Sequence, residues 1–245
     1  MWGNVDIGEG KKIWCGDVLY RDSCALISFA HWKYRQDRKI FPIAKDVIFD
    51  CGAFTFYMQG VKTNDVFWAK YYACVLAYLS KIGWFIIPDV IGGSEEENDR
   101  LIRNVPSSIK HKGVPVWHSN ESIDRLIRLC LEFDRVCIGL IKEHKPATSK
   151  KAKKILDEVF TVLYFLNGVS TKIHGLAMLD GRVLGKYPFT SADSSFVATN
   201  VPKTKTQITE VQCKLARTAI YKNKIECVKP PTPEEWFQRV CEHGY

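Results

Sequence analysis

The sequence predicts an α/β protein, a TIM-type (β/α)8 barrel with an irregular or degenerate eighth unit. Two observations lead to this prediction. Seven apolar strands alternate with helical stretches at intervals of roughly 25–35 residues, which is the rhythm of a parallel sheet. Three of these strands end in an aspartate (Asp50, Asp89 and Asp193), and a barrel of parallel strands gathers such side chains at one face.

The predicted strands are continuously apolar rather than alternating, as expected for parallel strands that are covered on both faces. They span residues 23–30, 46–50, 84–89, 114–118, 136–140, 172–178 and 189–192. For the eighth strand, residues 224–229 are the best candidate. Residues 1–22 are expected to form an irregular lead-in.

Helices are predicted between the strands. Apolar residues at helical spacing predict an amphipathic helix over 64–82: Phe67, Tyr71, Val75 and Leu79. The acidic run at 95–97 predicts the start of another helix, because the helix dipole favours acidic residues at its N-terminus. Further helices are expected at 122–133, at 150–166 and after the proline-rich turn at 230–233.

Length and composition predict a single domain. With 245 residues, 46% of them hydrophobic, the chain is long enough for one large core, so we expect one barrel domain over residues 1–245. Its last part, from about residue 200 to 245, is a basic C-terminal extension. No stretch approaches about 18 uninterrupted apolar residues and neither terminus carries a cleavable apolar segment, so we expect a soluble, cytoplasmic protein without a membrane partner.

The nine cysteines predict buried thiols in a reducing compartment. Their number is odd, their spacing is irregular, and no Cys-x-x-Cys pair is present. A structural zinc site is therefore not expected. We also expect no other metal and no cofactor. One set leaves zinc binding open, although it lacks the close ligand pair that such sites usually have: Cys213, Cys227, Cys241 and His243.

The chain is basic, with a net charge of +8. Basic residues concentrate at 142–154 and 203–224. This charge suits a polyanionic partner such as a nucleic acid, although charge alone supports only non-specific attraction.

In a closed barrel, the carboxyl ends of the strands would carry one set of side chains: Asp50, Asp89, Trp117, His118, Gly139, His174 and Asp193. Two carboxylates with different duties can perform a substitution at the anomeric carbon of a sugar, one as nucleophile and the other as proton carrier. A third carboxylate can accept N–H bonds from a base edge, and Phe54 and His174 could sandwich a flat ring. Each residue also has an ordinary structural interpretation, since a strand-end aspartate often caps the following helix and a histidine within a strand is often part of the core.

Several short motifs resemble those of the tRNA-guanine transglycosylases, in the same order and spacing over about seventy per cent of the chain. Residues 50–54 (Asp-Cys-Gly-Ala-Phe) resemble their aspartate-serine-glycine-glycine-aromatic motif, and residues 114–117 (Val-Pro-Val-Trp) resemble their proline-valine-glutamine strand. Residues 138–140 (Ile-Gly-Leu) and 174–176 (His-Gly-Leu) are similar to their glycine-glycine-leucine and methionine-glycine-valine strands. Residues 191–193 (Ser-Ala-Asp) stand where that family has its nucleophilic aspartate.

Residues 174–195 resemble still more closely the phage and bacterial transglycosylases that insert 7-deazaguanines into DNA. If the chain is phage-encoded, its location would be the cytoplasm of the host cell. Two features differ from the tRNA enzymes. Their zinc-binding cysteine cluster is absent, which favours DNA over tRNA as the substrate. Trp117 replaces the glutamine of their fourth strand, which leaves the identity of the base open.

The resemblance implies a two-step base exchange in DNA. Asp193 would attack C1′ of a guanosine and form a covalent glycosyl-enzyme, and Asp50 would act as general acid and then as general base toward the incoming 7-deazaguanine. Asp89 would bind N1–H and the exocyclic amine of the base. The resemblance implies that the remaining substrate-binding residues are Gly52, Phe54, Trp117, His118, Gly139, His174 and Gly175.

Three other functions remain open. The chain could be a tRNA-guanine transglycosylase that acts on RNA. It could be a metal-dependent barrel hydrolase that uses His118, His174 and Asp193, although its first strand lacks a His-x-His pair. It could also be a catalytically inactive nucleic-acid-binding barrel, although three carboxylates beside phosphates would oppose binding. The residues do not indicate an oligomeric state.

Overall fold

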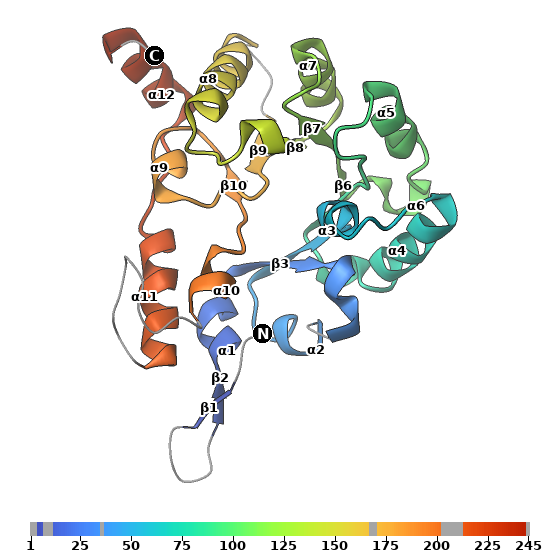
Figure 1. Ribbon diagram of the computed structural model, residues 1–245, viewed down its shortest axis with the longest axis vertical. Coiled ribbons are helices and arrows are strands. Elements are labelled where there is room, and N and C mark those ends of the chain that lie inside the picture. Colours follow the sequence, from blue (N-terminus) through green and yellow to red (C-terminus); the bar gives the residue numbers. More distant parts are fainter. Residues whose placement is uncertain (1–3, 7–11, 35–36, 167–170, 202–212, 244–245) are drawn as a thin grey trace.

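The computed structural model describes residues 4–6, 12–34, 37–166, 171–201 and 213–243, which adopt a mixed α/β fold (Figure 1). Its main strands form two four-stranded parallel sheets. The first sheet has the order β3 (Cys24–Ser28), β4 (Asp46–Asp50), β5 (Trp84–Ile86) and β6 (Gly113–Val114). The second has the order β7 (Val116–His118), β8 (Arg135–Gly139), β9 (Lys172–Gly175) and β10 (Ser191–Ala192).

The two sheets meet at Pro115, which separates β6 from β7. Proline has no N–H to donate, so it interrupts the hydrogen-bond ladder, but its carbonyl still accepts from the Cys137 N–H at 2.9 Å. The strand predicted at 114–118 is therefore present as two short segments, one in each sheet. Across both sheets, neighbouring strands follow the order of the chain, so the predicted parallel α/β arrangement is confirmed.

Helices connect the strands and lie around the two sheets (Figure 1). The connecting helices are α3 (Ala53–Met58), α4 (Asp65–Ala77), α5 (Glu95–Arg103), α6 (Ser107–Lys110), α7 (Ile123–Glu132), α8 (Lys150–Phe165) and α9 (Gly181–Leu184). An antiparallel pair, β1 (Asn4–Asp6) and β2 (Lys12–Trp14), precedes α1 (Cys15–Tyr20), and α2 (Asp37–Ile40) follows β3. The chain ends with α10 (Phe196–Asn200), α11 (Lys214–Glu226) and α12 (Pro233–His243).

Side-chain caps determine where the long helices begin. At the start of α5, the Ser94 hydroxyl accepts from the Glu97 N–H at 3.2 Å and the Glu97 carboxylate accepts from the Ser94 N–H at 2.8 Å, which is a capping box. Asn64, Ser122 and Ser149 cap α4, α7 and α8 in the simpler way, each accepting from a backbone N–H three residues ahead. These caps explain why the helices predicted at 64–82, 122–133 and 150–166 begin where expected. The first of them ends earlier than predicted, because α4 stops at Ala77 and a separate 3-10 helix covers Leu79–Lys81.

Aromatic side chains join the layers into one core. The Tyr71 hydroxyl of α4 lies 2.9 Å from the carbonyl oxygens of both Phe49 and Ile86, so α4 is held across β4 and β5. Trp84 of β5 contacts His174 of β9 edge to face, with their ring centroids 5.0 Å apart. Because β5 and β9 belong to different sheets, this contact joins the two sheets.

The predicted eighth strand at 224–229 is wrong. Most of this segment belongs to α11 and the turn after it, because Arg217, Thr218 and Tyr221 are buried at helical spacing. The helix lies against the chain that leads into β3, since the Lys222 ammonium donates to the Arg21 carbonyl at 2.8 Å. The segment 224–229 therefore adds no strand to the first sheet, in which β3 is an outer strand.

Two other expectations need correction, and a third concerns a segment that lies partly outside the described residues. The lead-in at 1–22 is not irregular where it is described, since it contains β1, β2 and α1. All nine cysteines are free thiols, but four are exposed rather than buried: Cys24, Cys213, Cys227 and Cys241. Most of these lie at helix ends near the C-terminus, where side chains meet solvent. Part of the basic segment at 203–224 lies outside the described residues.

Within the described ranges, no helix has both the length and the apolar character that a membrane span requires.

Candidate active site

The three strand-end aspartates meet at one edge of the sheets. Asp50 is the last residue of β4, Asp89 follows β5 by three residues, and Asp193 directly follows β10. The charges of both Asp193 and Asp89 act on the Asp50 carboxyl. Carboxyl ends of parallel strands lie on the same side of a sheet, so the strand order alone would bring these residues to one edge.

The Asp50 carboxyl has a pKa raised to about 6. Burial is the largest cause, because it disfavours the charged form, and repulsion by Asp193 and Asp89 acts in the same direction. The Ser28 hydroxyl and the Gly52 N–H partly offset this effect by lowering the pKa. Asp50 can therefore both hold and release a proton near neutral pH, as a general acid–base group must.

Gly52 determines how the chain leaves this strand. Its φ is +82°, a left-handed conformation that favours glycine. A Cβ at this position would lie 2.7 Å from the Ala30 Cβ and 2.9 Å from the Ala30 nitrogen, so a side chain would collide with the β3 connection. The glycine thus allows α3 to begin three residues after Asp50.

Asp89 forms a buried ion pair with His118. Their side chains are 8% and 3% exposed, and His118 Nε2 lies 2.9 Å from Asp89 Oδ2. Burial opposes a charge on His118, but Asp89 and Glu121 together raise its pKa to about 9, so the imidazole is positively charged at neutral pH. The Cys51 thiol also donates to Asp89 Oδ1 at 3.7 Å. Protein groups thus hold one side of the Asp89 side chain.

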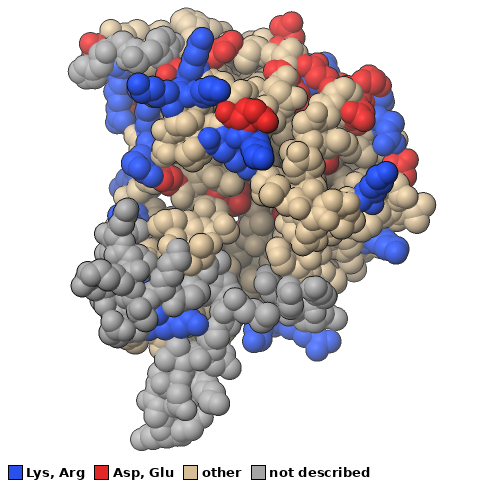
Figure 2. Space-filling model, viewed as in Figure 1, with Lys and Arg blue, Asp and Glu red and all other residues tan. Residues whose placement is uncertain are grey.

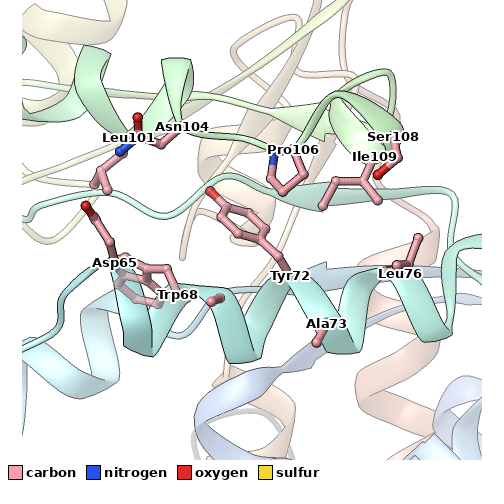
Figure 3. Close-up of a pocket in the computed structure, with 11 residues that line it drawn as sticks. Asp65, Trp68, Tyr72, Ala73, Leu76, Leu101, Asn104, Pro106, Ser108 and Ile109 are labelled. Atoms are coloured by element: carbon pink, nitrogen blue, oxygen red, sulfur yellow. The ribbon is translucent and has the colours of Figure 1, made fainter.

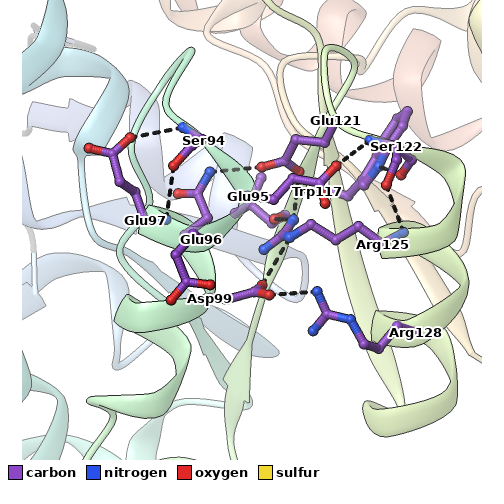
Figure 4. Close-up of polar contacts among 12 residues, drawn as sticks. Ser94, Glu95, Glu96, Glu97, Asp99, Trp117, Glu121, Ser122, Arg125 and Arg128 are labelled. Carbon is purple, nitrogen blue, oxygen red and sulfur yellow. Dashed lines mark hydrogen bonds and ion pairs between the residues drawn. The ribbon is translucent and has the colours of Figure 1, made fainter.

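A network of polar side chains supports this pair (Figure 4). The Glu121 carboxylate accepts from the His118 N–H at 2.8 Å and from the Asn98 amide at 2.8 Å. Arg125, whose side chain is fully buried, donates to Glu121 at 2.5 Å, to the Val116 carbonyl at 3.0 Å and to Asp99 at 3.0 Å. Arg125 thus ties α7 to β7 and α5 while it neutralises Glu121.

The sequence interpretation missed this network. One signal was present, because Asn98 occurs on the face of α5 that also buries Leu101 and Ile102. A polar residue on an apolar helix face must find a buried partner. Asn98 also accepts from the Val90 N–H at 2.7 Å, so it holds the segment that follows Asp89.

Asp193 is positioned by a histidine and a backbone N–H. Its Oδ1 accepts from the Ala177 N–H at 3.0 Å and lies 3.4 Å from His174 Nε2. The other ring nitrogen of His174 lies 2.8 Å from the Ser191 hydroxyl. His174 has no exposed surface, so in this structure it supports Asp193 and offers no free face to a ligand. The Asp193 side chain itself is 26% exposed.

Phe54 and Lys145 lie at the open side of the site. The Phe54 ring is 49% exposed, and the Lys145 ammonium lies 4.1 Å from its centroid. Burial lowers the pKa of Lys145, and the attraction of Asp193 partly offsets that shift. Lys145 follows β8 in the predicted basic loop at 142–154, but the sequence did not mark it as a site residue.

The remaining predicted residues divide between the site and the core. Gly139 faces His118, since a Cβ there would lie 3.2 Å from His118 Cδ2. Gly175 contributes its carbonyl, which accepts from the Asp193 N–H at 3.2 Å. Trp117 is not brought to the site: it is buried, and its Nε1 donates to the Ser122 carbonyl at 2.9 Å. Successive residues of a strand point to opposite faces, so Trp117 and His118 cannot both face the aspartates.

Two cavities lie away from the aspartates. One of about 400 Å³ lies between α4 and the α5–α6 segment and is lined by Trp68, Tyr72 and Ile109, among others (Figure 3). The other, of about 660 Å³, lies at the amino ends of β5 and β8, beside Trp84 and Arg135. Figure 2 shows a hollow near the middle of the face, with acidic side chains inside and basic ones beside it.

Metal-binding geometry is not found among the described residues, since no group of three or more His, Cys, Asp and Glu side chains is arranged to hold an ion there. His118 pairs with Asp89 and His174 with Asp193, so the two histidines belong to separate clusters. Of the alternative zinc ligands, Cys213, Cys227 and Cys241 are exposed free thiols.

No protein-family model and no curated protein matches the chain. The resemblance to transglycosylases therefore rests on the short motifs and their order.

Asp50→Asn is expected to stabilise the protein at pH 8. The Asp50 carboxyl has a pKa of about 6 in the folded protein, above its ordinary value of 3.8. The folded protein therefore favours the protonated carboxyl. The stability that Asp50 contributes is fully present below about pH 3.8 and is lost as the pH rises through about 6. A difference of roughly 2 pKa units corresponds to about 3 kcal/mol. Urea unfolding of the wild type and of Asp50→Asn from pH 4 to pH 8 measures the difference in their free energies of unfolding. A stability difference that does not change over this range would contradict the raised pKa.

Proposed function

We propose that this protein is a base-exchange transglycosylase, which replaces guanine in DNA with a 7-deazaguanine derivative through a covalent aspartyl–glycosyl intermediate. The observation that carries the proposal is the contrast between two neighbouring carboxyl groups. Asp50 is desolvated and has a pKa of about 6, whereas Asp193 accepts a backbone N–H bond and is partly exposed. Different environments assign one carboxyl group to proton transfer and the other to nucleophilic attack.

The fold proposed for this activity is an incomplete (β/α)8 barrel. Support comes from the strand order, in which β3 to β10 follow the chain, and from the contact of Trp84 with His174 across the interior. In this arrangement α11, beside the entry to β3, takes the place of the eighth strand. The active site of such a barrel lies at the carboxyl ends of its strands, where the three aspartates are.

The first step expels guanine. A carboxylate oxygen of Asp193 attacks C1′ of the target nucleotide, and the electron pair of the C1′–N9 bond moves to the guanine. The neutral Asp50 carboxyl donates its proton to the departing base and becomes a carboxylate. The products are a glycosyl ester of Asp193, free guanine and ionised Asp50.

The second step installs the new base. The Asp50 carboxylate removes the N9 proton of the incoming 7-deazaguanine, whose N9 then attacks C1′ and releases the Asp193 carboxylate. Asp50 ends the cycle protonated, as it began. Two displacements at the same carbon retain its configuration.

Base recognition is assigned to Asp89. The carboxylate has one side fixed by His118 and Cys51, and its charge suits the N1–H and exocyclic amine of a guanine-type base. His118 carries a positive charge, so in this scheme it holds Asp89 in position and does not act as a base. Gly139 leaves room for the imidazole, because it has no side chain of its own.

Asp89→Asn is expected to weaken binding of a free 7-deazaguanine base by about 10- to 100-fold, which is the loss of one charge-assisted hydrogen bond in a buried site. The amide keeps an acceptor for His118, whose Nδ1 also stays 3.7 Å from a Glu121 carboxylate oxygen, so the fold should persist. Isothermal titration measures the affinity, with Asp193→Asn as the control that should bind the base normally. Unchanged affinity of Asp89→Asn for the base would show that Asp89 has only a structural role, as the partner of His118.

Exchange of radiolabelled guanine into nucleic acid tests the function. We expect incorporation into guanine-containing duplex DNA and little into tRNA, because the net charge is +8 and the cysteine cluster of the tRNA enzymes is absent. Binding should weaken with salt, with a log–log slope near −0.9 per phosphate contacted. Incorporation into tRNA together with none into DNA would reverse the assignment of the substrate.

A further inference from the structure

Helix α3 has large apolar side chains on both of its faces. On the inner face, Phe56 packs against Phe67, with ring centroids 4.9 Å apart, and Ala53 is buried. On the outer face, Phe54, Tyr57 and Met58 point away from the core. A surface helix ordinarily presents polar residues to solvent, so this outer face is unusual.

The outer face is a continuous apolar patch. The exposed fractions are 49% for Phe54, 55% for Tyr57 and 65% for Met58, and Val61 just beyond the helix is 41% exposed. Phe54, Tyr57 and Met58 follow the spacing i, i+3 and i+4, which places them on one side of α3. Figure 2 shows uncharged surface in the region where Figure 1 places α3. Exposed apolar patches on soluble proteins usually mark binding surfaces.

The patch adjoins the candidate active site. Gly52 packs on Ala30 and sets the start of α3 three residues after Asp50, so the helix has little freedom to move relative to that carboxyl group. Lys145 covers the Phe54 ring at 4.1 Å and is itself attracted by Asp193. The Lys145 ammonium therefore lies against the apolar patch and within electrostatic range of Asp193, the proposed nucleophile.

We propose that the outer face of α3 inserts into duplex DNA beside the target guanine and fills the gap that the base leaves in the stack. This inference rests on the proposed function, and the occupant of the patch is double-stranded DNA. A base cannot reach strand-end aspartates from inside a duplex, and its extrusion costs a few kcal/mol. Aromatic and apolar side chains such as Tyr57 and Met58 can replace lost stacking contacts, as apolar wedges do in other DNA-bending proteins.

The first test compares two forms of one substrate. Exchange rates are measured on a duplex and on the same strand without its complement, for the wild type and for the double variant Tyr57→Ala/Met58→Ala. Leu131→Ala is the matched control, because Leu131 is 68% exposed but lies near the end of α7, away from the strand carboxyl ends. In the double variant the duplex rate should fall at least about tenfold and the single-strand rate should change less than about twofold, since only the duplex must be unstacked.

Equal losses on both forms, or no loss on the duplex, would overturn the insertion. A second measurement separates this result from a failure of the proposed function. 2-Aminopurine placed next to the target guanine should become more fluorescent when the wild type or Leu131→Ala binds the duplex, but not when the double variant binds. Unchanged fluorescence on wild-type binding, or no duplex binding at all, overturns the insertion and leaves the patch to another partner. A fluorescence rise without any exchange supports the insertion and overturns the base exchange instead.

Discussion

Asp193→Asn should lower the rate of guanine exchange by at least about a thousandfold, because loss of an attacking nucleophile removes the step on which the reaction depends. An asparagine side chain has nearly the same size and keeps an oxygen that can accept from the Ala177 N–H. The variant should therefore fold normally. Labelled-guanine exchange on duplex DNA measures the loss.

Two controls make this result specific. Circular dichroism and thermal unfolding should match the wild type, and affinity for the free base should be retained, since Asp89 is unchanged. Full exchange activity in Asp193→Asn would show that another residue is the nucleophile.

Arg125→Leu should lower the free energy of unfolding by about 3–5 kcal/mol, because removing one partner of a buried ion pair leaves an uncompensated charge. The charge left behind is that of Glu121, and Asp99 and the Val116 carbonyl would lose hydrogen bonds as well. Urea unfolding measures the change.

Arg128→Leu is the matched control for this variant. Arg128 pairs with the same Asp99, at 2.5 Å, but its side chain is 50% exposed. An exposed pair contributes about 0–1 kcal/mol, so this variant should remain close to the wild type. Equal losses of unfolding free energy in the two variants would mean that burial of the Arg125 network does not add to the stability of the protein.

The parallel strands could be predicted because each is a short apolar run between turns. The starts of the predicted helices were accurate for a related reason, since Asn64, Ser94, Ser122 and Ser149 cap them locally. The eighth strand was mispredicted at 224–229 because a short window cannot separate a strand from a helix end. Arg217 and Tyr221 are both buried, and their spacing of four residues identifies a helix. Which residues are buried depends on tertiary packing, so the sequence did not show it.

The candidate site was predicted in part. Strand ends are visible in the sequence, so the meeting of Asp50, Asp89 and Asp193 at one edge could be anticipated. The direction of each side chain could not, and this is why Trp117 was placed in the site although it points to α7. The charges that tune the site were also invisible, since Arg125 and Lys145 reach it from segments far along the chain.

The proposed base exchange requires a covalent bond between Asp193 and C1′ of the DNA. Wild-type protein is incubated with a guanine-containing oligonucleotide, denatured, and analysed by intact-protein and peptide mass spectrometry. The proposed mechanism predicts an adduct with the mass of protein plus oligonucleotide minus guanine, located on the peptide that contains Asp193 and absent from Asp193→Asn. An adduct that persists in Asp193→Asn, or that maps to Asp50, would contradict it.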